Sequence, residues 1–150
     1  MQDVRLAKSD EYTTQMDAAR RGLVTPQLKT VAEKEQMRLE DLMALVASGQ
    51  VAIPANKMHI SLSPEGVGKR CRTKINVNLG VSPEHNNLDE ELEKVRNAIA
   101  MKAEAIMDLS NFGKTQEFRR KLIDMSTAMI GTVPMYDAVA CSTKTSKTSP

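Results

Sequence analysis

Cysteine and aromatic residues are scarce in this sequence, and each shortage argues against a class of site. The 150 residues include two cysteines, Cys71 and Cys141, which stand far apart and form no CxxC motif or paired Cys/His spacing. The chain therefore carries no zinc or iron–sulfur motif, and both thiols are expected to be reduced. Aromatic residues make up 3% and tryptophan is absent, which argues against a stacking platform for single-stranded nucleic acid.

An excess of charge and a long apolar run are lacking as well. The 21 basic and 19 acidic side chains leave a net charge of +2, too close to neutral to indicate nucleic-acid binding. No stretch approaches the roughly 20 apolar residues of a membrane span, and the start lacks the apolar core of a secretory signal. We therefore expect a cytoplasmic protein that has neither a membrane nor a nucleic acid as partner.

The first half of the chain predicts helices and then a connecting segment. Residues 1–50 form the expected helical segment, in which Thr13 or Thr14 caps a helix over QMDAARR. Thr25 followed by proline begins a second helix, and a third is expected over LEDLMALVA. Residues 51–73 read as a connecting loop region with one short apolar run at its start, because proline and glycine recur through it.

Three evenly spaced blocks between residues 74 and 140 carry most of the information: KINVNLG, AIMDLS and MIGTVPMY. Each reads as a strand, and a helical pattern separates each block from the next. Asn78, Met107 and Tyr136 lie 29 residues apart and then 29 again. That period fits one strand, one helix and two loops, so the strands are expected to be parallel. The sequence predicts an α/β fold, but a closed eight-stranded barrel needs about 250 residues.

Polar residues at the carboxyl ends of these strands are the candidate binding groups, because parallel α/β folds bind ligands there. Asn76 and Asn78 point to the same side of their strand, which is the interior if the sheet forms a barrel. Two buried amides need hydrogen-bond partners. A polar ligand and a structural polar cluster are equally good explanations at this point.

Other motifs are weaker candidates. DLSNFGKT resembles a phosphate-binding loop, but Asp108 stands where that motif needs its first glycine, and a carboxylate repels phosphate. His59 and His85 are isolated, which favours capping or solvent contact over metal binding. The basic cluster Lys69–Lys74 is interpreted as a solvated loop, with a role near a phosphorylated ligand as the minority alternative.

Several motifs together resemble one family. TQMDAARRG, IPAN, TKINVNLG, EAIMDLS and IGTVPMY occur in the order found in the phosphomethylpyrimidine synthase family of thiamin biosynthesis, a family of radical S-adenosylmethionine (SAM) enzymes. The resemblance covers about residues 13 to 140. It implies that the helical segment precedes the first three βα units of an incomplete (β/α)8 barrel, which would occupy residues 74–140.

The resemblance also implies a chemistry. Members of the family are lyases that rearrange 5-aminoimidazole ribonucleotide, with S-adenosylmethionine, a [4Fe-4S] cluster on a CxxCxxxxC motif and a divalent metal such as zinc. Full-length members are expected to be homodimers. Carried over by motif, the substrate-binding residues are Asn78, Met107 and Tyr136. No catalytic or metal-binding residue is assigned in this chain.

Two branches of the family use this substrate. SLSPEGVG, INVNLG, SNFGKT and AMIGTVPMYDA resemble the branch that makes 5-hydroxybenzimidazole, the lower-ligand precursor of some cobamides. The thiamin branch more often has NANIG, DLSTG and VPIY.

The resemblance has limits. Lys102, Met58 and Cys71 depart from the commoner family residues. The chain also ends before the cluster cysteines, and residues 141–150 read as a disordered tail. We therefore expect an N-terminal fragment that is inactive alone. The alternative is a non-catalytic ribonucleotide-binding or scaffold module derived from the family.

Overall fold

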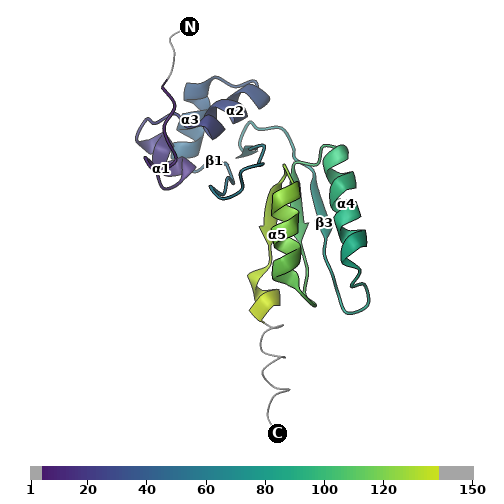
Figure 1. The fold of residues 1–150 in the computed structure, drawn as a ribbon. Helices are drawn as coiled ribbons and strands as arrows, with labels where there is room; N and C mark the ends of the chain where they lie inside the picture. Colours follow the sequence, from purple (N-terminus) through teal and green to yellow (C-terminus); the bar gives the residue numbers. More distant parts are fainter. Residues whose placement is uncertain (1–4, 139–150) are drawn as a thin grey trace. The chain divides into compact units, whose positions relative to one another are not determined.

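The computed structural model of the chain describes residues 5–138 and divides into two units, one ending at Lys74 and the other beginning at Ile75 (Figure 1). The first unit contains α1 (Gln15–Arg20), α2 (Pro26–Lys34), α3 (Leu39–Ala47), β1 (Val51–Ala52) and β2 (Val67–Gly68). The second contains β3 (Asn76–Leu79), α4 (Leu88–Ala100), β4 (Ala105–Asp108), α5 (Thr115–Met125) and β5 (Met129–Thr132).

Threonine caps and a glycine determine where helices of the first unit begin and end. The hydroxyl of Thr14 accepts a hydrogen bond from the Asp17 amide at 3.1 Å, and the hydroxyl of Thr25 accepts one from the Leu28 amide at 3.0 Å. Each contact satisfies an amide that lacks a partner in the first helical turn. Gly49 follows α3 with φ +76°, a left-handed conformation that glycine adopts without strain. These predicted helix boundaries are confirmed.

A short antiparallel pair follows the helices. Val51 pairs with Gly68, and Ala52 pairs with Val67. Residue 68 must be glycine, because φ is +145° and a Cβ atom would lie 2.2 Å from the Gln50 carbonyl oxygen. The core of this unit is aliphatic and comes from the helices and β1: Ala19, Leu28, Val31, Ala32, Leu42, Val46, Val51 and Ile53.

The second unit is built on a parallel sheet in the order β3-β4-β5. Asn78 pairs with Met107, which in turn pairs with Gly131 on β5. Hydrogen bonds continue past the strand ends, since the Leu109 amide donates to the Leu79 carbonyl at 2.8 Å. The predicted parallel arrangement is confirmed, although each strand is shorter than its sequence block.

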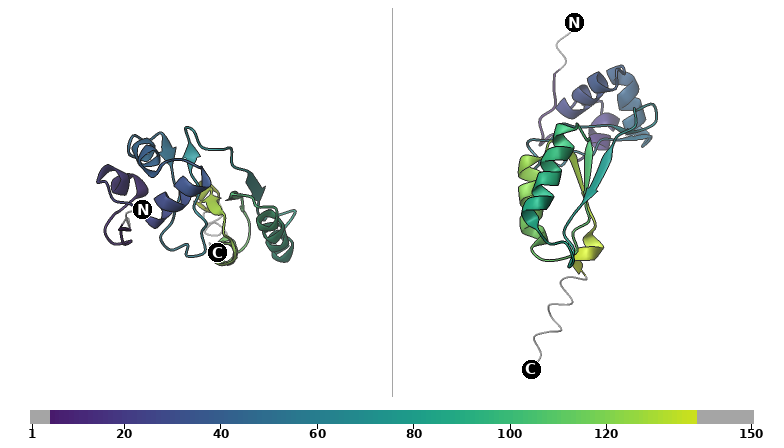
Figure 2. Two further views of the ribbon diagram at one scale, coloured as in Figure 1. Left: turned by 90° about the horizontal axis from the view of Figure 1, so that it is seen from above. Right: turned by 90° about the vertical axis from the view of Figure 1, so that its right-hand side faces the viewer.

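Both helices of this unit cover the same face of the sheet (Figure 2). Right-handed crossovers place successive helices on one side in this way. The core lies between the helices and that face: Leu79, Leu92, Val95, Ala98, Ile106, Phe118, Leu122 and Ala128. Because strand side chains alternate, Asn76, Asn78 and Met107 lie on the opposite face.

Some expectations differ from the structure or fall outside it. The connecting region 51–73 contains β2, a strand that the sequence analysis missed. The described sheet is three-stranded and open, so it gives α/β architecture without showing a barrel. The predicted disordered tail 141–150 lies outside the described residues. Among the described helices, none is long and apolar enough to cross a membrane.

Candidate functional site

Asn78 lies on the uncovered face of β3 beside a second amide. The side-chain amide of Asn76 donates to Oδ1 of Asn78 at 2.9 Å, and both side chains are exposed. The expectation that both point the same way is confirmed, but they are not buried in this chain. Each still has donor or acceptor capacity for a polar ligand, because an amide group can make several hydrogen bonds.

Met107 lies beside Asn78 in the sheet register and is partly buried. Its thioether extends over the next strand: a Cβ atom on Gly131 would lie 2.7 Å from Cε and 2.9 Å from Sδ of Met107. Gly131 does not have a positive φ, so the backbone would accept other residues there. A larger residue at 131 would therefore have to displace the flexible end of Met107, and its Cβ atom would meet no backbone atom closer than 4.0 Å.

Tyr136 does not lie in register with Asn78 and Met107. The strand β5 ends at Thr132, and residues 134–138 form a helical turn in which Tyr136 is 39% exposed. The Tyr136 amide donates to the Val133 carbonyl at 3.0 Å. The 29-residue period therefore matches the register once, from Asn78 to Met107. The next register partner is Gly131, because the chain turns into a helix before it reaches Tyr136.

A charged cluster on the helix side of the sheet was missed by the sequence analysis. Nε of Arg119 donates to Oδ2 of Asp108 at 2.7 Å, and its other nitrogens reach both carboxylate oxygens of Asp137 at 2.5 and 3.0 Å. Asp108 is fully buried. The hydrogen bond to Arg119 holds the pKa of Asp137 below its usual value, and that to Asp137 raises the pKa of Arg119. The sequence held one sign that Arg119 is not a solvent-facing residue. It lies on the same helix face as the buried residues Thr115, Phe118 and Leu122.

Asp108 also hydrogen-bonds within the loop DLSNFGKT, which resembles a phosphate-binding loop in sequence. Oδ1 of Asp108 accepts the Ser110 amide at 2.9 Å, so the carboxylate occupies one of the amides that a phosphate would need. The Ser110 hydroxyl accepts the Val81 amide at 3.1 Å. These contacts connect the loops after β3 and β4, and they agree with the interpretation that the loop is not a nucleotide-binding motif.

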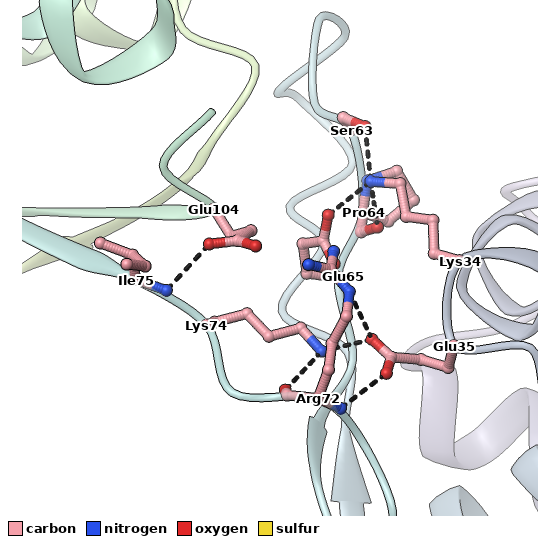
Figure 3. A network of polar contacts seen from close by, with 9 residues as sticks. All are labelled: Lys34, Glu35, Ser63, Pro64, Glu65, Arg72, Lys74, Ile75 and Glu104. Carbon is pink, nitrogen blue, oxygen red and sulfur yellow. Dashed lines mark hydrogen bonds and ion pairs between the residues drawn. The ribbon is translucent and has the colours of Figure 1, made fainter. Parts of the chain in front are cut away.

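Two members of the basic cluster Lys69–Lys74, Arg72 and Lys74, form ion pairs within the first unit (Figure 3). Nζ of Lys74 donates to a Glu35 carboxylate oxygen, and the Arg72 amide donates to the other at 2.8 Å. The side chain of Lys74 is 6% exposed and that of Glu35 1% exposed. Glu65 accepts from Arg72 at 3.1 Å. The prediction of a fully solvated loop is wrong for Lys74, whose charge is neutralised internally.

Comparison with known proteins decides the family. Residues 14–149 match the Radical SAM ThiC family. The chain belongs to that family. It is 71% identical over 128 residues to a phosphomethylpyrimidine synthase of Clostridium novyi (strain NT), and 68% identical over 128 residues to one of Clostridium botulinum (strain Hall). Both alignments cover 85% of this chain and 29% of the relative. The chain thus spans under a third of the length of these curated relatives.

The iron–sulfur cluster that the Radical SAM ThiC family implies does not fit the residues described here. Residues 5–138 contain no group of three His, Cys, Asp or Glu side chains that could hold a metal ion. Burial raises the pKa of the Cys71 thiol, and Glu35 raises it further. A thiol in that environment resists the deprotonation that metal binding requires. No chemical step through a cluster is therefore assigned to these residues.

Proposed function

We propose that this chain is the first part of a radical S-adenosylmethionine lyase that acts on 5-aminoimidazole ribonucleotide. The observation that carries the proposal is the 71% identity to the Clostridium novyi phosphomethylpyrimidine synthase, which continues over 128 residues. In this proposal the parallel strands β3, β4 and β5 are the first three strands of a (β/α)8 barrel. Their uncovered face becomes the barrel interior.

The residues proposed to contact the ribonucleotide are Asn78, Met107 and Tyr136. Asn78 supplies an amide that donates and accepts hydrogen bonds, as a polar substrate requires. Met107 supplies an adaptable apolar surface. Tyr136 offers a partly exposed ring with a hydroxyl. The cluster, S-adenosylmethionine and a divalent metal belong to other parts of the full-length enzyme, which is proposed to be a homodimer in the cytoplasm.

The product of the proposed reaction has two candidates. The names of the relatives favour the hydroxymethylpyrimidine phosphate of thiamin biosynthesis. The stretches SLSPEGVG, INVNLG and SNFGKT favour 5-hydroxybenzimidazole. The two products differ in mass and absorbance, so chromatography of the reaction mixture separates them.

A segment exchange tests the proposal. Residues 13–140 replace the corresponding segment of the Clostridium novyi synthase, and the chimera is assayed for conversion of 5-aminoimidazole ribonucleotide. We expect a folded, active chimera. In it, Asn78→Ala should weaken ribonucleotide binding by about 2-fold to 12-fold, because one hydrogen bond to a polar group is worth about 0.5–1.5 kcal/mol.

Two controls make the test decisive. Glu93→Ala removes an exposed side chain of α4 and should leave binding unchanged. A chimera that folds and binds the ribonucleotide without converting it would favour the alternative, a non-catalytic module. A folded chimera that does not bind the ribonucleotide would exclude both.

A further inference from the structure

Two of the proposed substrate contacts are each followed directly by an aspartate. Asp108 follows Met107 at the end of β4, and Asp137 follows Tyr136 in the helical turn after β5. Both carboxylates bind the same side chain, that of Arg119 on α5. The guanidinium group therefore connects the end of β4, which carries Met107, to the helical turn that carries Tyr136.

The contacts of Arg119 use its planar shape. Its Nε donates to Asp108 at 2.7 Å, while the two terminal nitrogens donate to the two oxygens of Asp137 at 2.5 and 3.0 Å. A guanidinium group has five N–H donors in a fixed plane, so it can hold two carboxylates at once. The side chain of Arg119 is 16% exposed and that of Asp108 is fully buried, which limits screening by solvent.

The turn that carries Tyr136 has a second connection to the same helix. The Thr115 hydroxyl donates to Oδ1 of Asp137 at 3.1 Å. The first turns of α5 thus hold residue 137 through two side chains, Thr115 and Arg119. This explains how Tyr136 keeps a defined place although the strand register no longer applies to it.

The position of Met107 depends on the same helix through its neighbour. Successive side chains on a strand point to opposite faces, so Asp108 faces α5 when Met107 faces the uncovered side. A contact that fixes Asp108 against α5 fixes the backbone that aims Met107. Arg119 reaches neither proposed contact directly and lies on the other face of the sheet.

From this geometry we infer that Arg119 is a positioning residue, which sets Met107 and Tyr136 relative to one another by holding Asp108 and Asp137. The inference rests on the proposed function for the identity of the ligand. The connection between α5, β4 and the turn after β5 does not depend on it. A lysine cannot replace this arginine, because an ammonium group is a point donor without the planar fork.

A fluorine label on Tyr136 tests the connection without any ligand. The chain has two tyrosines, so Tyr12→Phe followed by incorporation of 3-fluorotyrosine leaves Tyr136 as the single reporter in the full 150-residue protein. Arg119→Met and Arg119→Lys should shift and broaden its fluorine resonance. Arg120→Met removes the same charge from the neighbouring exposed position of α5 and should leave the resonance unchanged.

A second variant is needed because Arg119→Met leaves the buried carboxylate of Asp108 without its cation, and this variant could misfold. Asp137→Ala removes the outer carboxylate and keeps the contact between Arg119 and Asp108 intact, so the sheet should remain folded. It should broaden the Tyr136 resonance as Arg119→Lys does. An unchanged resonance in both Asp137→Ala and Arg119→Lys would overturn the inference.

Titration of the chimera, with and without these substitutions, with 5-aminoimidazole ribonucleotide separates this inference from the proposed function; the unsubstituted chimera is the parent. If both are correct, Asp137→Ala and Arg119→Lys weaken binding by about 10-fold, the loss expected when a contact worth about 1.4 kcal/mol is displaced. Arg120→Met should bind as the parent does. If the parent does not bind while the Tyr136 resonance still responds, the proposed function fails and the positioning role stands. Binding that is unchanged despite a broadened resonance would overturn the claim that Arg119 sets the ligand contacts.

Discussion

The thioether of Met107 fills the space above Gly131 on the neighbouring strand. A methyl group on Gly131 would lie 2.7 Å from Cε and 2.9 Å from Sδ of Met107. Carbon and sulfur atoms do not approach so closely, so a side chain at residue 131 and the present position of Met107 exclude each other. The strands β4 and β5 are thereby matched through a large and a small residue in one register row.

Gly131→Ala should destabilise the second unit by about 1 kcal/mol or less, below the usual cost of overpacking, because the atoms it meets are the flexible end of Met107, which can move aside. Hydrogen exchange of the β4 and β5 amides measures this, because it reports each unit of the chain separately. In a Met107→Ala background the same change should cost almost nothing, since the conflicting thioether is gone. Equal costs in the two backgrounds would show that the glycine serves the backbone and not Met107.

Gly80→Ala should be more damaging than Gly113→Ala, although both glycines have a positive φ. At Gly80 φ is +142° and a Cβ atom would lie 2.5 Å from the Ser110 amide nitrogen, which belongs to rigid backbone. At Gly113 φ is +74° and a Cβ atom would meet no atom within 4 Å. We expect Gly113→Ala to cost about 1–2 kcal/mol from backbone strain alone. Equal losses of hydrogen-exchange protection in β3 and β4 would contradict this.

The turn after β5 should lose stability as the pH falls into the acid range. The pKa of Asp137 lies below its ordinary value of 3.8 because Arg119 hydrogen-bonds to the charged form, with a further contribution from Thr115. A lowered pKa in the folded state stabilises the fold above the ordinary pKa, and this contribution is lost as the pH falls through the folded value. The Tm difference between the parent and Asp137→Ala should therefore be constant near neutral pH and narrow below about pH 4. A difference that stays constant down to pH 2 would contradict the role of the ion pair.

Glu35→Ala should destabilise the first unit by about 3 kcal/mol or more, because it leaves the buried ammonium group of Lys74 without its carboxylate. Glu33→Ala, two residues earlier at an exposed position of α2, is the matched control and should change stability by less than about 0.5 kcal/mol. Hydrogen exchange of the α2 amides measures both. Replacing Glu35 and Lys74 together by methionine should recover most of the loss, since well-packed apolar residues often substitute for a buried ion pair. A double variant as unstable as Glu35→Ala would show that the loss comes from packing.

The local parts of the fold could be predicted from the sequence. The helix over Leu39–Ala47 has the predicted bounds, because an apolar stripe and a following glycine are signals within one short segment. The strand at Val67–Gly68 was missed, because two residues carry no period and their pairing with Val51 and Ala52 joins distant segments. The predicted strands extend further along the sequence than the observed ones for the same reason, since pairing with a neighbouring strand decides where a strand ends.

The candidate site was predicted in part. The sequence placed Asn78 and Met107 at matching positions, and the register pairs them. Their contact with a ribonucleotide stays a prediction. The equal spacing to Tyr136 did not produce a third member of the row, because β5 ends at Thr132 and a helical turn follows. Arg119 was missed, since its importance comes from Asp108 and Asp137, which lie 11 and 18 residues away in the sequence.

The sequence by itself determined the family, the order of helices and strands, and the parallel direction of the strands. Those features follow from motifs, caps and periods that act over one turn or one βα unit. Only the tertiary structure decided that Met107 lies over Gly131, that Asp108 and Asp137 share Arg119, and that Lys74 is buried against Glu35. Such contacts join residues distant in the chain, and their strength depends on burial and geometry, which residue types and spacings do not specify.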